Sequence, residues 1–159
     1  MYFDVSWCPR HIPRTLIDAA VMFSYAYHSI PEELGMEIEF TKKDGEFIGS
    51  CEYDEEEQMA FVFVYRALYP SSSVKTIFHE ITHIWQRLNK RLFVSEDYSL
   101  KEWDGVEYSY KDLNQDAYND LPWERDANMH EELMFIKFQE AYPEFVEYLD
   151  GDYFDRLEK

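Results

Sequence analysis

Residues 78–84 read Phe-His-Glu-Ile-Thr-His-Ile, and this stretch decides which further residues a functional site would need. On a helix, side chains four residues apart lie on one face with Cβ atoms about 5–6 Å apart, so His79 and His83 can bind one metal ion. Imidazole suits zinc, and a catalytic zinc site takes three protein ligands and keeps one position for water. Glu80 follows the first histidine, where its carboxylate can take a proton from that water. A third ligand must come from elsewhere in the chain.

The composition is that of a folded domain with a strongly acidic surface. Of the 159 residues, 46% are hydrophobic and 18% are aromatic, which predicts a single domain over 1–159 with a substantial core. The chain has 15 Lys and Arg against 33 Asp and Glu, and its net charge is −18. This charge repels phosphate backbones and anionic membranes. We therefore expect no direct nucleic-acid or membrane binding, and a protein or peptide substrate that is basic.

Cysteine usage and apolar patterning indicate the cellular compartment. The two cysteines, Cys8 and Cys51, do not form a C-x-x-C pair or a disulfide framework. Residues 1–7 lack the features of a secretory leader, and no apolar run approaches the length of a membrane span. We expect a cytoplasmic protein in a reducing compartment. Cys8 is expected to be a free thiol in a loop, with an inhibitory contact to the zinc as the alternative.

The segments before the motif predict one helix and three strands. Apolar residues recur at helical spacing over 13–28, where a proline suits the first turn. Strand patterns follow over 37–42, 46–53 and 60–65, with a turn at 43–45 between the first two. The last strand is almost continuously apolar, which is typical of a strand buried on both faces. We expect these three strands to form an antiparallel meander.

The motif itself lies in a predicted helix that packs on this sheet. Residues 70–73, Pro-Ser-Ser-Ser, break the strand pattern and offer hydroxyl groups for the helix N-terminus. From residue 74 onward the apolar side chains recur at helical spacing, and the two histidines border the apolar stripe. Residues 89–91, Asn-Lys-Arg, place positive charge at the C-terminal end, where the helix dipole favours it.

The C-terminal half predicts a hairpin and two further helices. Residues 101–108 contain an Asp-Gly pair that favours a two-residue turn between strands. This hairpin is expected to be a plain surface connection, with a flap over the metal site as the alternative. Pro122 begins a long helix, and Pro143 begins a last short helix that ends at Gly151.

The search for a third ligand points away from histidine. A histidine six residues after His83 would complete a three-histidine site, but position 89 is asparagine. A glutamate on a second helix is the other arrangement, since zinc also accepts two histidines and a glutamate. Glu124 stands in the first turn of the long C-terminal helix and is the predicted third ligand. Asp126 and His130 remain the alternatives.

Three neighbours of this glutamate have expected roles. Ala127 lies one turn further on, where its small side chain lets the second helix approach the motif helix closely. Asn128 lies on the same face as Glu124 and can hold the second ring nitrogen of a ligand histidine. Tyr118 can stabilise an oxyanion as a catalytic residue, with a packing role as the alternative in a chain that has 13 tyrosines.

The two ligand-bearing segments resemble those of the ImmA/IrrE-like metallopeptidases. In this chain the H-E-x-x-H motif is followed by E-x-D-A-N from Glu124 and by E-L-M from Glu132. Small phage metallopeptidases with a Y-x-x-x-P-x-E-x-x-A segment are similar too, and Tyr118, Pro122 and Ala127 match their pattern around the glutamate.

This resemblance to bacterial and phage gluzincin-type metallopeptidases implies both a fold and a set of residue roles. The fold would be α+β, a minimal zincin-like fold with a small antiparallel or mixed sheet on the motif helix and a second ligand-bearing helix. His79, His83 and Glu124 would bind Zn²⁺, and Glu80 would be the general base. The expected function is a zinc-dependent peptide hydrolase that acts on a specific cytosolic protein. The alternative is an acidic, non-catalytic binding or inhibitor protein, a nucleic-acid mimic with a structural or vestigial zinc site.

Overall fold

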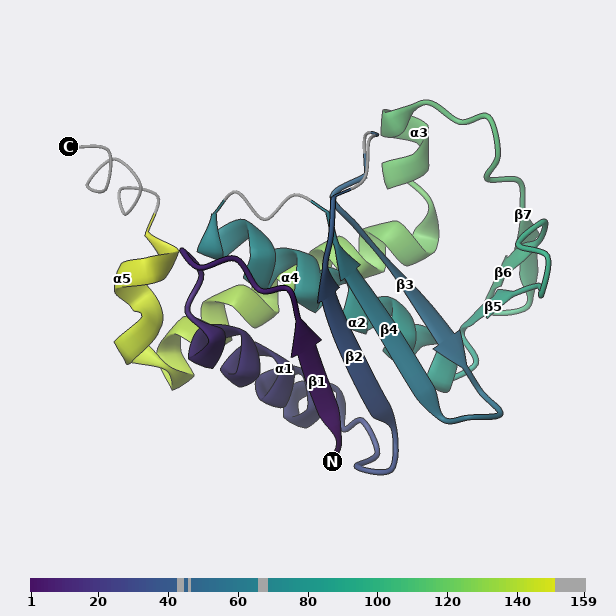
Figure 1. Ribbon diagram of the computed structural model, residues 1–159. Helices are drawn as coiled ribbons and strands as arrows, with labels where there is room; N and C mark the ends of the chain where they lie inside the picture. Colours follow the sequence, from purple (N-terminus) through teal and green to yellow (C-terminus); the bar gives the residue numbers. More distant parts are fainter. Residues whose placement is uncertain (43–44, 46, 66–68, 151–159) are drawn as a thin grey trace.

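A four-stranded sheet with helices packed against it forms the body of the protein, an α+β architecture (Figure 1). The computed structural model describes residues 1–42, 45, 47–65 and 69–150. The strands of the large sheet are β1 (Phe3–Ser6), β2 (Gly35–Phe40), β3 (Gly49–Asp54) and β4 (Met59–Val64). The three long helices are α1 (Arg14–His28), α2 (Pro70–Leu88) and α4 (Pro122–Ala141). The predicted α+β class is therefore confirmed.

The large sheet is mixed, so the predicted antiparallel meander is wrong. Its strand order is β1-β2-β4-β3, with β1–β2 and β2–β4 parallel and only β3–β4 antiparallel. The almost wholly apolar β4 takes a central place with a partner on each side. β3 carries the charged residues Glu52 and Asp54 and lies at the edge, where polar side chains remain solvated.

Two further details of the sheet differ from the expectation. β1 was not predicted, because it has four residues and only Val5 among them is buried. β4 is buried on one face only: Ala60, Val62 and Val64 are buried, whereas the alternate residues are half-buried. The helices cover one face of the sheet, and this accounts for the alternation.

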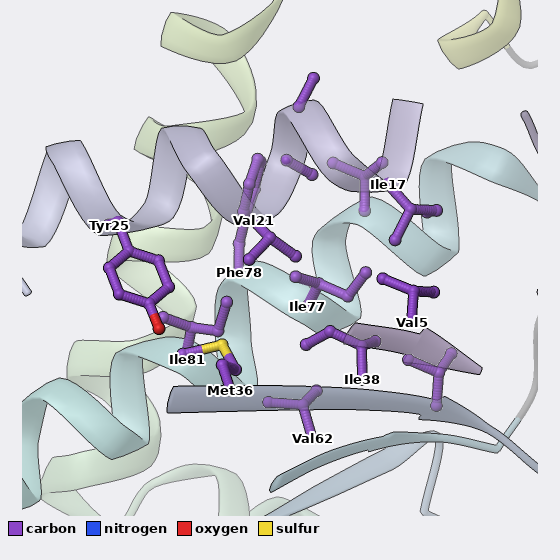
Figure 2. Close-up of a cluster of buried hydrophobic side chains, with 14 of the residues drawn as sticks. Val5, Ile17, Val21, Tyr25, Met36, Ile38, Val62, Ile77, Phe78 and Ile81 are labelled. Carbon is purple, nitrogen blue, oxygen red and sulfur yellow. The ribbon is translucent and has the colours of Figure 1, made fainter. Parts of the chain in front are cut away.

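The core lies between that face of the sheet and the helices α1 and α2 (Figure 2). Figure 2 shows strand side chains pointing up toward the helices and Tyr25 and Val21 of α1 pointing down, while Phe78 of α2 extends up toward α1. The strands contribute Val5, Met36, Ile38 and Val62, α2 contributes Ile77, Phe78 and Ile81, and α1 contributes Ile17, Val21 and Tyr25. This packing fixes the rotation of α2 about its axis, and so determines the direction in which its polar face points.

The helix α2 begins one turn earlier than the serine hydroxyls suggest. Tyr69 is its N-cap, Pro70 is its first residue, and Ser72 lies inside the first turn. The Ser72 hydroxyl donates to the Tyr69 carbonyl at 2.9 Å and accepts from the Tyr69 N–H at 3.3 Å. The helix ends at Leu88 with Asn89 as C-cap, as predicted.

A second, smaller sheet lies beyond the β3 edge of the large one (Figure 1). The predicted hairpin is confirmed as β6 (Lys101–Trp103) and β7 (Val106–Tyr108), and β5 (Leu92–Val94) pairs with β6. Asp104 and Gly105 have φ angles of 48° and 83°, the left-handed turn that an Asp-Gly pair favours.

The helices predicted to begin at Pro122 and Pro143 are present, and a short helix that was not predicted precedes them. The short helix α3 (Gln115–Asn119) precedes α4, which begins at Pro122 as predicted. Pro143 begins a 3-10 turn, η1 (Pro143–Phe145), which continues as α5 (Val146–Leu149). The predicted helix end at Gly151 and two of the three residues of the turn at 43–45 lie outside the described residues. None of the helices in the described ranges has both the length and the apolar character to cross a membrane.

Candidate metal centre

Three side chains from α2 and α4 converge at one point, and they are the three that the spacing predicted. The Nε2 atom of His79 lies 3.0 Å from Glu124 Oε2, and the Nε2 atom of His83 lies 3.1 Å from Glu124 Oε1. The two Nε2 atoms are 3.1 Å apart. Donor atoms that bind one zinc ion tetrahedrally at about 2.0–2.1 Å lie about 3.3 Å from one another, so this group could hold a metal ion.

The hydrogen bonds of the His83 ring direct its free lone pair toward this point. The Gln86 side-chain amide nitrogen donates to the Trp123 carbonyl at 3.0 Å and to Asp126 Oδ2 at 2.8 Å. The amide oxygen of Gln86 therefore faces His83 and accepts from its Nδ1–H at 2.8 Å. With the ring proton on Nδ1, the lone pair on Nε2 is available as a ligand.

A carboxylate does the same for His79. The Nδ1 atom of His79 lies 3.1 Å from Glu131 Oε2, so its N–H donates to that carboxylate, and in the neutral ring Nε2 carries the lone pair. The expectation that Asn128 would hold a ligand histidine is wrong, because Glu131 and Gln86 take the two positions. Asn128 instead lines the neighbouring cavity.

The electrostatics of the group favour a positive charge at its centre. Burial alone would lower the pKa of His79, but hydrogen bonds to Glu124 and Glu131 raise it to about 10. Burial would raise the pKa of Glu124, yet its hydrogen bonds to His79 and His83 hold that pKa well below the ordinary value. Two imidazole lone pairs and a carboxylate repel one another unless a proton or a metal ion lies among them, and a divalent cation meets this requirement best.

Glu80 lies beside the three candidate ligands in a confined position. It is 7% exposed, and burial is the main cause that raises the pKa of its carboxyl. Cys51 on β3 contributes a side-chain hydrogen bond to it. Gly49 on the same strand leaves room for the carboxylate, because a Cβ there would meet the Thr76 methyl at 2.5 Å and Glu80 Oε1 at 3.3 Å. The edge strand thus holds the carboxylate close to the metal-binding group.

The two alternative third ligands are engaged elsewhere, and so is Cys8. Asp126 accepts from Gln86, and its Oδ1 lies 3.8 Å from both Arg91 and His130. His130 is bound at Nδ1 to the hydroxyl of Tyr27 on α1 at 3.2 Å. The Cys8 thiol faces the Ile12 carbonyl at 3.5 Å and does not line the cavity at the metal centre.

A cavity of about 560 Å³ opens onto the three candidate ligands. The large sheet contributes β3 to one wall, and the small sheet contributes Leu92, Val94 and Lys101 to another. The hairpin predicted as a plain surface connection therefore also forms part of the wall of the site. Tyr118 from α3 lines the same cavity, and its hydroxyl is hydrogen-bonded to Glu124. The pKa of Tyr118 is raised, mainly by burial.

Comparison of the chain with protein-family models, with curated proteins and with solved structures finds no match. The chemical interpretation of the site therefore depends on its own residues.

Two residues that orient the histidines were not predicted, although their spacing carries a signal. Gln86 lies three residues after His83, and Glu131 lies seven residues after Glu124, so each shares a helix face with a ligand. A search for polar side chains on the same face as a ligand would find both. Their role follows only from the packing of α4 on α2, because each reaches across the helix pair.

The first prediction concerns the identity of the third ligand. Glu124→Ala should lose stoichiometric zinc, because two histidines alone leave the site one ligand short. His130→Ala, the matched control on the same helix, should bind zinc as tightly as the wild type. Metal content after dialysis, measured by mass spectrometry with circular dichroism as the test of folding, checks both. Stoichiometric zinc in folded Glu124→Ala would contradict the assignment.

The second prediction concerns pH. Since the pKa of His79 without a metal ion is about 10, protons compete with zinc for Nε2 across the neutral range. The apparent zinc affinity, measured against a competing chelator, should rise from pH 7 to pH 9 and not level off near pH 7. Glu131→Gln keeps a hydrogen-bond acceptor but removes a charge, so its affinity should level off at a lower pH. A zinc affinity that stays constant above pH 7 in both the wild type and Glu131→Gln would contradict this prediction.

Proposed function

We propose that the protein is a zinc-dependent peptide hydrolase in which Glu80 is the general base. The observation that carries the proposal is the convergence of His79, His83 and Glu124 on one point with Glu80 buried beside them, at the end of an open cavity. Two imidazoles and a carboxylate are a donor set that zinc prefers, and they leave a further coordination position for water. Calcium and magnesium prefer oxygen ligands, so the two histidines argue against them.

Zinc, when bound, lowers the pKa of a coordinated water toward about 7 and polarises a carbonyl group. In this proposal the Glu80 carboxylate takes a proton from the attacking water and passes it to the leaving amine. Its confinement by Gly49 and Cys51 restricts the carboxylate to a small range of positions, which proton transfer requires. The raised pKa of Glu80 favours a base that can also return the proton.

Tyr118 supports this reaction as a hydrogen-bond donor. A tyrosine phenol is protonated at neutral pH, and burial raises the pKa of this one further, so the hydroxyl can donate to an oxygen that gains negative charge. The hydroxyl lies beside Glu124, next to the point where the substrate carbonyl would react. We assign it the role of stabilising the oxyanion.

The edge strand β3 gives a peptide substrate a place to bind. β3 pairs with β4 on one side only among the described strands, and its residues Gly49, Ser50 and Cys51 line the cavity. An extended peptide can add to such an edge through backbone hydrogen bonds, which would lead its chain past the metal-binding group. This arrangement favours a peptide over a small metabolite as substrate.

A second candidate function is carried by the net charge of −18. A strongly acidic domain can occupy the nucleic-acid-binding surface of a basic protein, and the metal site would then be structural. Such binding depends on charge and weakens as salt increases.

The third prediction separates these two functions. Glu80→Gln should retain one zinc ion but lose hydrolysis of a proteome-derived peptide mixture by about 10²–10⁴-fold, because the base is removed and the ligands stay. Glu57→Gln, which neutralises an exposed glutamate in the turn before β4, should cleave like the wild type. Mass spectrometry of the peptides provides the measurement.

The acidic-mimic function predicts a different pattern. The wild type and Glu80→Gln would then leave the peptides equally intact, and both would bind a basic DNA-binding protein in a salt-sensitive way. A wild-type protein that contains zinc and cleaves no peptide would contradict the hydrolase proposal.

A further inference from the structure

Two cationic side chains project into the cavity next to the metal-binding group. Arg87 lies on α2 one turn beyond His83, on the same face as the two histidines, and Lys101 comes from β6 in the small sheet. Both side chains are half-buried. Neither was predicted as a site residue, and neither belongs to the metal-binding group.

Neither cation has a carboxylate partner within ion-pair distance among the described residues. The other unpaired Lys and Arg residues there are exposed, whereas these two are half-buried. A few cations in the described ranges do form ion pairs, as Arg14 does with Asp18 at 2.8 Å and Lys75 with Glu132 at 3.6 Å. Arg87 instead lies over the ring of Tyr53, with Cζ 5.4 Å from its centre. The Lys101 Nζ atom lies 4.6 Å from the ring centre of Tyr110 and 5.5 Å from that of Trp123.

These aromatic contacts hold the cations in place without using their hydrogen-bond donors fully. A guanidinium group over a ring keeps its N–H groups in its own plane, and an ammonium group has three donors to offer. Partial burial of an unpaired cation costs free energy, and a bound anion recovers it. Burial is the main cause that lowers the pKa of Lys101; the charges of Glu124 and Glu80 act against it, and the charge of Arg87 acts with it.

The cavity also differs in charge from the surface around it. Its lining contains three carboxylates, those of Glu80, Glu124 and Glu131, and the two cations. A divalent metal ion makes this lining net positive by one charge, whereas the whole chain carries −18. An anionic group therefore finds its favourable place inside the cavity and is repelled elsewhere on the protein.

We propose that Arg87 and Lys101 form a carboxylate-binding subsite beside the metal centre, which selects peptides that carry a carboxylate close to the scissile bond. The carboxylate belongs either to an Asp or Glu side chain or to a free C-terminus. Arginine can bind such a group with two parallel hydrogen bonds, and lysine adds a charge from the small sheet. The inference rests on the proposed hydrolase function, and it replaces the basic substrate expected from net charge with one that is acidic at this subsite.

Three hydroxamate-capped dipeptides test the subsite through binding, because the hydroxamate anchors each to the metal ion. They are Leu-Asp amide, Leu-Asn with a free C-terminus, and the neutral Leu-Asn amide. Isothermal titration calorimetry with zinc-loaded protein should show at least one charged probe binding about tenfold or more tighter than the neutral probe. Tighter binding of the first supports an acidic side chain as the natural group, and tighter binding of the second supports a C-terminus.

Variants of the two cations test whether these side chains cause the tighter binding of the charged probes. Arg87→Gln and Lys101→Gln should each reduce it severalfold or more, while Lys137→Gln, an exposed charge on α4, should leave it unchanged. Zinc content and circular dichroism confirm that each variant is folded and loaded. Equal binding of all three probes to the wild type, or a preference that survives in both cavity variants, overturns the subsite but leaves the hydrolase proposal standing. If the protein binds no zinc and none of the probes, both proposals fail.

Discussion

The structure depends on one electrostatic constraint, the convergence of two imidazole lone pairs and a carboxylate between α2 and α4. These groups repel one another without a cation, and the fold nevertheless brings them together at about 3 Å. The apolar core determines the rotation of α2, and the fully buried Ala127 lets α4 pack close to it. Gln86 and Glu131 then fix the ring protons on the outer nitrogens. These two hydrogen bonds direct the lone pairs of the two histidines at the same point.

The elements with a clear periodic pattern could be predicted, but their pairing could not. Helices at 13–28, around the motif and from Pro122 follow from apolar spacing and proline, and the Asp-Gly turn follows from the backbone that those residues favour. Strand order is decided by contacts between distant segments: the apolar β4 lies between β2 and β3, although β3 directly follows β2 in the chain. β1 is short and gains its place only by pairing with β2, so its own residues hardly indicate it.

The same division applies to the site. The group that could hold a metal ion, His79, His83 and Glu124, could be predicted, because helical spacing puts two of these residues on one face and the third stands at a helix start. The orienting and lining residues, such as Gln86, Glu131 and Lys101, act across gaps between elements, and their roles depend on how α4 and the small sheet pack on α2. The net charge of the whole chain indicated a basic partner, whereas the cavity lining contains the cations Arg87 and Lys101 and differs in charge from the rest of the surface.

The coordination of the metal ion tests this account most directly. X-ray absorption spectroscopy of the zinc-loaded protein should show only nitrogen and oxygen ligands at about 2.0–2.1 Å, with the signature of two imidazoles. Sulfur ligands at about 2.3 Å would mean that Cys51 binds the ion, and a shell of oxygen alone would mean that the histidines do not. Either result would contradict a centre formed by His79, His83 and Glu124.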